Sequence, residues 1–217
     1  MGRDERSSNA GGRTRVLVAD DHPVVRTGLA AVLVQQPDLD LVAEAENGAR
    51  AVALYREHRP DVCLMDLRMP VMDGVEAIRT ITAEFPAARI LALTTYEGDA
   101  DIRRALEAGA RGYLLKDMLL TEVIGAVRAV HRGERVIPTA VAARLAEFPE
   151  RSELTERELE VLQLVARGLS NKDVARAIGR TDETVKIHLK NTFAKLGVAD
   201  RTEAVTVALT RGLIHLD

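Results

Sequence analysis

Five short apolar runs alternate with amphipathic stretches over residues 13–131, and this alternation constrains the fold more than any other feature of the chain. The runs are Val16–Ala19, Leu41–Ala43, Val62–Met65, Ile90–Leu93 and Tyr113–Leu115. The stretches with helical spacing are Val24–Val34, Ala49–His58, Val75–Phe85, Asp101–Ala108 and Thr121–Val130. Continuous apolar runs of this length are typical of strands that helices cover on both faces. The pattern predicts a doubly wound α/β domain with a parallel sheet.

After residue 150 the strand pattern stops, and signals for helix starts appear four times. Thr155, Ser170 and Asp200 are each followed three residues later by an acidic residue, which is a capping box or its acidic variant. Thr181 opens a further segment that has two carboxylates in its first turn, where they favour the helix dipole. Glycines stand where these helices should end, at Gly168, Gly179, Gly197 and Gly212. We therefore predict a small four-helix domain over residues 151–217.

The remaining segments join or precede these two domains. Residues 1–12 are polar and aperiodic, and we predict that they form a disordered lead. Residues 132–150 contain two prolines around Thr139–Phe148, which has helical character, so we predict a linker with one short helix.

Charge and cysteine content exclude several classes of protein. The net charge of -3 excludes an overall basic nucleic-acid coat, although residues 151–217 alone carry +1 and residues 13–131 carry -4. A single cysteine, Cys63, excludes an intramolecular disulfide, and its apolar neighbours predict a buried structural thiol. No apolar run approaches the ~20 residues of a membrane span. The first residues lack the apolar region of a signal peptide, so we expect a cytoplasmic protein with no membrane contact.

Three carboxylates follow the ends of two predicted strands. Asp20 and Asp21 come after Val16–Ala19, and Asp66 comes after Val62–Met65. In an open parallel sheet the carboxyl ends of the strands border the ligand-binding crevice, so these carboxylates should meet there. Their mutual repulsion favours a hard divalent cation with oxygen ligands. The sequence therefore predicts a Mg²⁺ site.

Two further polar residues follow the next two strands. Thr94 comes after Ile90–Leu93, and Lys116 comes after Tyr113–Leu115. A hydroxyl and an ammonium group that converge on a metal-bound carboxylate make a binding place for a phosphoryl group. Asp66 would be the nucleophile and would form an acyl phosphate. Asp20 or Asp73 alone would be interpreted as a turn or helix cap, and Lys116 alone as a surface lysine, but the whole set favours the phosphoacceptor interpretation.

These residues resemble the receiver domains of two-component response regulators. The matching features are Asp20-Asp21, the segment Asp66–Gly74, Thr94, and Tyr113 three residues before Lys116. The resemblance implies a flavodoxin/CheY-like α/β fold with a parallel five-stranded sheet in the order 2-1-3-4-5. It implies phosphorylation of Asp66 by a cognate sensor histidine kinase, Mg²⁺ as cofactor and a metal contact from the backbone carbonyl of Arg68.

The resemblance also implies a conformational response. The phosphate would draw in Thr94 and turn Tyr113 inward. Thr95 stands where many receivers carry a small residue, which leaves the lifetime of the phosphate open.

Residues 171–190 hold two predicted helices separated by Gly179-Arg180, which is a helix-turn-helix arrangement. Thr181–Leu196 is the predicted recognition helix. Its core-facing side chains are those with helical spacing, Val185, Leu189, Phe193 and Leu196. Lys186, Ile187 and Lys190 lie on the opposite side, where lysine can donate to guanine and isoleucine can touch a thymine methyl group.

Other residues of this domain could hold DNA phosphates. Those at helix starts are Ser170, Asn171, Lys172, Thr181 and Thr184. Lys195 and Arg201 offer further cations. For His188 we expect a half-buried structural position rather than a DNA contact.

Residues 154–213 resemble the helix-turn-helix domain of LuxR-type and NarL/FixJ-type regulators. The matching segments are Leu154–Glu158, Gly168–Lys172, Thr184–His188, Lys195–Val198 and Asp200–Thr202. By this resemblance Lys186, Ile187 and Lys190 contact bases, and the last helix, Arg201–Arg211, contacts a second protomer.

Together the resemblances imply a transcription regulator that binds double-stranded promoter DNA, is controlled by phosphorylation, and is a homodimer when phosphorylated. We expect signalling chemistry and not an enzyme. The alternative is a phosphorelay or partner-binding protein whose helical domain binds protein, since a net charge of +1 is weak for a DNA binder. A third possibility keeps DNA binding without phosphate control.

Overall fold

A computed structural model describes residues 12–94, 98–116, 120–147 and 154–216. The chain divides into two compact units. The first comprises residues 1–95 and 105–137, and the second comprises residues 96–104 and 138–217.

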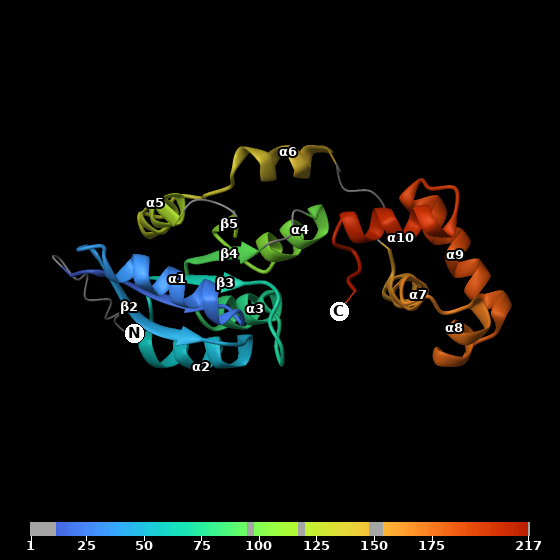
Figure 1. Cartoon of the computed structure of the whole chain (residues 1–217), viewed down its shortest axis with the longest axis horizontal. Helices are drawn as coiled ribbons and strands as arrows, with labels where there is room; N and C mark the ends of the chain where they lie inside the picture. Colours follow the sequence, from blue (N-terminus) through green and yellow to red (C-terminus); the bar gives the residue numbers. More distant parts are fainter. Residues whose placement is uncertain (1–11, 95–97, 117–119, 148–153, 217) are drawn as a thin grey trace, which may run out of the picture. The chain divides into compact units, whose positions relative to one another are not determined.

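Strands and helices alternate along the first part of the chain, as the sequence pattern predicted. Their bounds are β1 (Thr14–Ala19), α1 (Pro23–Val34), β2 (Leu39–Ala45), α2 (Gly48–His58), β3 (Val62–Asp66), α3 (Gly74–Glu84), β4 (Ile90–Thr94), α4 (Asp99–Glu107), β5 (Gly112–Leu115) and α5 (Leu120–His131). The strands pair in parallel in the order β2-β1-β3-β4-β5, which confirms the predicted topology. In Figure 1 the labelled strands β2, β3, β4 and β5 follow one another across the sheet.

The apolar runs bury the middle of the sheet. Val16 and Val18 of β1 and Leu64 of β3 pack with Leu33 of α1 and Val127 of α5 in one continuous core. Burial of this much aliphatic surface is the main favourable contribution to the stability of such a domain. Strand β2 differs from the prediction: five of its seven residues are partly or fully exposed, and it lies at one edge of the sheet.

The single cysteine occupies the middle of this sheet. Cys63 of β3 is fully buried, and burial raises the pKa of its thiol. A buried protonated thiol is a poor nucleophile, which confirms the structural interpretation of Cys63.

Two of the predicted site residues are the last residues of their strands, which each run one position beyond the predicted end. Asp66 ends β3 and is aligned with Leu93 of β4, and Thr94 ends β4 and is aligned with Leu115 of β5. The ladder of the sheet therefore holds the backbone of both residues. Side chains on such regular elements are positioned more rigidly than side chains on loops.

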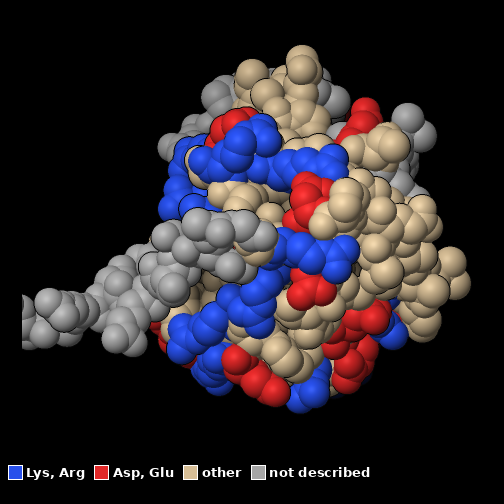
Figure 2. Space-filling view, turned by 90° about the vertical axis from the view of Figure 1, so that its left-hand side faces the viewer, with Lys and Arg blue, Asp and Glu red and all other residues tan. Residues whose placement is uncertain are grey.

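Basic and acidic side chains are mixed at the amino-terminal edge of the sheet. Figure 2 faces this end of the first unit and shows several groups of Lys and Arg side chains, with Asp and Glu among them and uncharged residues between. Arg128 of α5 pairs there with Asp38, which precedes β2, at 2.8 Å, and Arg132 pairs with Glu134 at 2.7 Å. The predicted site residues of this unit follow the opposite, carboxyl-terminal ends of the strands.

The second unit is helical beyond residue 138. Its helices are α6 (Thr139–Glu147), α7 (Glu156–Ala166), α8 (Asn171–Ala177), α9 (Asp182–Leu196) and α10 (Arg201–Thr210). Helix α6 is the predicted short helix of the linker, and Phe148, its predicted last residue, lies outside the described residues. The buried side chains of α7, α8, α9 and α10 form one apolar cluster.

The predicted caps begin four of these helices. Thr155 and Glu158 form a complete capping box at α7, and Ser170, Thr181 and Asp200 each accept a bond from the backbone N–H three residues later. Gly197 ends α9 with φ of 72°, a left-handed conformation that glycine adopts at little cost. None of the described helices combines the length and the apolar character that crossing a membrane requires.

Candidate functional site

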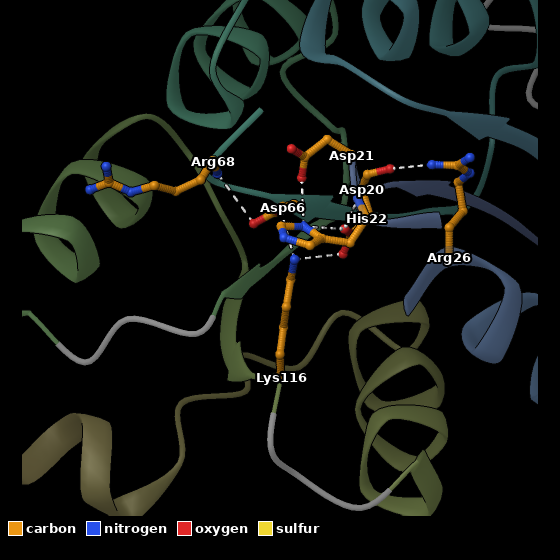
Figure 3. Close-up of polar contacts among 7 residues, drawn as sticks. All are labelled: Asp20, Asp21, His22, Arg26, Asp66, Arg68 and Lys116. Carbon is orange, nitrogen blue, oxygen red and sulfur yellow. Dashed lines mark hydrogen bonds and ion pairs between the residues drawn. The ribbon is translucent and has the colours of Figure 1, made fainter. Parts of the chain in front are cut away.

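The predicted carboxylates and the predicted lysine meet at the carboxyl-terminal edge of the sheet (Figure 3). Asp20 follows β1 and Asp66 ends β3; the residues are 0% and 2% exposed. The ammonium nitrogen of Lys116 lies 2.7 Å from Oδ2 of Asp20 and 2.7 Å from Oδ2 of Asp66. The prediction that these side chains converge is confirmed by this geometry.

Strand pairing explains why residues so distant in sequence come together. Strands β1 and β3 are neighbours, with Ala19 aligned to Met65, so the residues that follow these two positions lie side by side. The backbone N–H of Lys116 donates to the carbonyl oxygen of Thr94 at 2.8 Å, which brings the end of β5 beside the end of β4. Thr94 is buried at the end of β4, and Tyr113 is fully buried in β5.

Burial and charge set the ionisation of this cluster. Burial raises the pKa of Asp66 above its ordinary value, although the Lys116 ammonium and the Arg68 N–H lower it in part. Burial alone would lower the pKa of Lys116, but Asp20 and Asp66 outweigh this effect and raise it. Lys116 therefore stays a cation between the two carboxylates.

The loop after β3 is shaped by backbone contacts. The N–H of Arg68 donates to Oδ1 of Asp66 at 3.2 Å, and Asp73 caps α3 by accepting from the N–H of Glu76 at 2.8 Å. A Cβ on Gly74 would lie 1.9 Å from the carbonyl oxygen of Asp66, so no other residue fits without moving the loop. Val71 has a φ of 72°, which is costly for a β-branched side chain.

The donor groups at this edge suit a divalent cation. One ligand atom from each of Asp20, Asp21, His22 and Asp66 can be chosen so that all four lie within 4.8 Å of one another. The buried oxygens Oδ2 of Asp20 and Oδ1 of Asp21 face Lys116 Nζ at 2.7 Å and His22 Nδ1 at 2.8 Å respectively. Three carboxylates against one ammonium leave a negative pocket, and oxygen donors of this kind fit Mg²⁺.

His22 was not identified from the sequence, although it directly follows Asp20-Asp21. Its Nδ1 lies 2.8 Å from Oδ1 of Asp21 and 3.4 Å from Oδ1 of Asp20. His22 occupies the cap position of α1, but its side chain makes no capping hydrogen bond. A role for the Arg68 carbonyl in metal binding stays a prediction, and Thr95 lies outside the described residues.

A second candidate surface lies on α9. Val185 and Leu189 are buried and Phe193 and Leu196 are partly buried in the helical core, as predicted. Lys186, Ile187 and Lys190 are exposed, and Ile187, at 54%, is among the most exposed large apolar residues of the described chain. His188 is half-buried, in agreement with the sequence analysis.

The predicted phosphate contacts differ in exposure. Ser170, Lys172 and Thr181 are exposed at the starts of α8 and α9, and Asn171 and Thr184 are half-buried beside them. Lys195 and Arg201, in contrast, have partners inside the unit: Lys195 Nζ lies 2.7 Å from Oε2 of Glu158, and Arg201 donates to the Asn171 side chain and to backbone carbonyls.

Lys186 also has local partners. Its Nζ lies 3.0 Å from Oδ2 of Asp182 and 3.4 Å from Oε2 of Glu183, and these carboxylates raise the pKa of the lysine. Exposed pairs of this kind contribute little stability, so a phosphate or a base can replace them at small cost.

Two family models match the chain. The response regulator receiver domain matches residues 16–128, and the luxR family of bacterial regulatory proteins matches residues 152–208. The chain is 40% identical over 215 residues to the transcriptional regulatory protein LnrK of Bacillus subtilis, covering 92% of this chain and 98% of that protein. It is 42% identical over 206 residues to the response regulator protein VraR of Staphylococcus aureus, covering 93% and 99%.

Solved structures agree with these relatives. The crystal structure of the response regulator ChrA of a heme-sensing two-component system has a TM-score of 0.57 and 40% identity, over 94% of this chain and 100% of that one. A structure of two RcsB dimers bound to two parallel DNAs has a TM-score of 0.65 and 27% identity, over 92% and 99%.

Proposed function

The chain belongs to the response regulators that join a receiver domain to a LuxR-type DNA-binding domain, and from this premise we propose how its own residues work. Asp66 accepts a phosphoryl group from a sensor histidine kinase, and this modification controls binding to promoter DNA. The receiver spans residues 13–131, the linker residues 132–150 and the DNA-binding domain residues 151–217.

One observation carries the assignment of Asp66. The ammonium of Lys116 lies 2.7 Å from this carboxylate and 2.7 Å from that of Asp20, and both aspartates are almost fully buried. An oxygen of Asp66 would attack the phosphorus of the donor, and the bond from phosphorus to the donor's leaving group would break. Lys116 and Thr94 would then bind the oxygens of the transferred group.

Mg²⁺ would complete the site. Asp20, Asp21 and Asp66 would hold it through carboxylate oxygens, with the Arg68 carbonyl as a further ligand. The ion would neutralise the negative charge of the carboxylates and of the phosphoryl group.

The helical domain would bind DNA through α9. Lys186, Ile187 and Lys190 would reach base edges in the major groove, while Ser170, Asn171, Lys172, Thr181 and Thr184 would hold phosphates. The protein would bind as a dimer and read two half-sites about one helical turn apart, ~34 Å. Helix α10 would provide a contact between the protomers.

Incubation with acetyl phosphate and Mg²⁺, followed by mass measurement of the intact chain, tests the assignment of Asp66. We expect one phosphoryl group on the wild type and none on Asp66→Asn. Asp73→Asn is a matched control, because Asp73 is an exposed helix cap on the same loop and asparagine caps equally well; it should be modified like the wild type. Modification of Asp66→Asn at the wild-type level would contradict the assignment.

A further inference from the structure

His22 gives the acidic pocket a nitrogen donor in addition to its oxygens. The imidazole belongs to an exposed residue at the start of α1, yet its Nδ1 is 2.8 Å from Asp21 and 3.4 Å from Asp20 (Figure 3). Its backbone N–H also donates to Oδ1 of Asp20 at 2.9 Å, which fixes the turn that presents the ring. The His22 side chain is 66% exposed, and it makes no capping hydrogen bond to α1.

The spacing of these donors matches one coordination sphere. Neighbouring ligands of an ion with metal–ligand bonds of ~2.1 Å lie about 3 Å apart in octahedral and somewhat farther apart in tetrahedral geometry. The distances from Nδ1 to the two carboxylate oxygens bracket this value. The ring therefore reaches the ion that Asp20 and Asp21 hold without a change in the fold.

We propose that the pocket binds a borderline transition-metal dication, of the class of Co²⁺ or Zn²⁺, with His22 as a nitrogen ligand beside the carboxylates of Asp20, Asp21 and Asp66. Imidazole suits such ions, whereas Mg²⁺ prefers oxygen ligands and water. His22 therefore sets the metal preference of the site: it strengthens binding of the transition metal and leaves the affinity for Mg²⁺ unchanged. The inference rests on the proposed metal site at these carboxylates.

The test is a Co²⁺ titration of the full-length protein followed by visible absorption, with Mg²⁺ then added to displace the Co²⁺. The visible absorption of Co²⁺ changes with its ligands and geometry, so a different spectrum for His22→Ala would report the loss of the imidazole, and the displacement yields the Mg²⁺ affinity in the same experiment. His22→Ala should weaken Co²⁺ binding at least about tenfold, the low end of what a lost supporting contact costs in a metal site. The Mg²⁺ affinity deduced for the variant should equal that of the wild type.

His58→Ala controls for adventitious binding to surface histidines, because His58 is a partly exposed histidine at the end of α2 in the same unit. It should bind Co²⁺ like the wild type. Equal Co²⁺ affinity of His22→Ala and wild type, or an equal loss of Co²⁺ and Mg²⁺ affinity, would overturn the inference while leaving the Mg²⁺ site in place. Failure of both ions to bind the wild type would overturn the metal site itself.

Discussion

Lys116 is the residue on which the charge balance of the receiver site depends. Its ammonium lies between two carboxylates that are 0% and 2% exposed, and it follows the last strand of the sheet. Removing one partner from a buried charge cluster costs more folding free energy than the intact cluster contributes. The reason is that the remaining charges stay buried without a partner.

We therefore expect Lys116→Ala to lower the stability of the receiver by about 3–5 kcal/mol in the absence of metal. Mg²⁺ should restore a part of this loss, because a cation can replace the ammonium between Asp20 and Asp66. Thermal unfolding followed by circular dichroism, with and without Mg²⁺, measures both effects. A shift in melting temperature on Mg²⁺ addition no larger in the variant than in the wild type would contradict this account.

The sequence was sufficient to predict Asp20, Asp66, Thr94 and Lys116 as neighbours, because parallel strands bring their carboxyl ends to one edge of the sheet. It was not sufficient to predict which groups His22, Lys195 and Arg201 contact. The partners of these side chains depend on ring orientation and on helix packing, which no spacing in the sequence reports. The sequence pattern around a lysine or arginine does not distinguish one that is exposed from one that pairs with a residue of another helix.

At the scale of secondary structure, Glu158 joins the start of α7 to the end of α9. Its Oε2 accepts from the backbone N–H of Thr155 at 2.8 Å and from Lys195 Nζ at 2.7 Å. Burial would raise the pKa of Glu158, but Lys195 and Thr155 outweigh burial and hold the pKa below its ordinary value of 4.5. The charged form of Glu158 therefore stabilises the helical domain.

Glu158→Gln should lower the stability of the domain by about 2 kcal/mol at pH 7, since a charged hydrogen bond is lost while the cap is kept. Because the pKa of Glu158 is lower in the folded state, its contribution is present above pH 4.5 and is lost as pH falls through the folded pKa. The difference between variant and wild type should therefore shrink in acid. Hydrogen exchange of the α7 amides in the full-length chain measures this difference in stability.

The control for this experiment is Glu160→Gln, which removes an exposed carboxylate of the same helix that pairs with Arg157. An exposed pair contributes ~0.5 kcal/mol or less, so this variant should exchange nearly like the wild type. Equal effects of the two substitutions, or a difference for Glu158→Gln that is independent of pH, would refute the role given to Glu158.

Helix and strand positions were largely predictable because periodicity and caps are local. The four predicted caps form as expected. The differences lie mainly at the ends of elements, which depend on the partner strand as well as on the local sequence. The ladder extends β3 to Asp66 and β4 to Thr94, and β2 is more exposed than its apolar run predicted.

At the scale of the whole molecule, the helical domain must supply the DNA affinity. Lys186→Ala and Lys190→Ala should each weaken binding to promoter DNA and make that binding less dependent on salt. A variant with one cation fewer at the DNA releases fewer counterions when it binds. The slope of log affinity against log salt should fall by up to about one per lysine. Arg79→Ala, an exposed cation on α3 of the first unit, should change neither. Lack of DNA binding by the wild type at low salt would instead favour a protein partner.

The central claim is that phosphate on Asp66 controls DNA binding by α9. The most direct test is a DNA-binding titration of the full-length protein with and without acetyl phosphate and Mg²⁺, on protein shown by mass to carry one phosphoryl group. We predict tighter binding of the modified wild type, and no effect of acetyl phosphate on Asp66→Asn. Complete modification of the wild type with an unchanged DNA affinity would contradict the account.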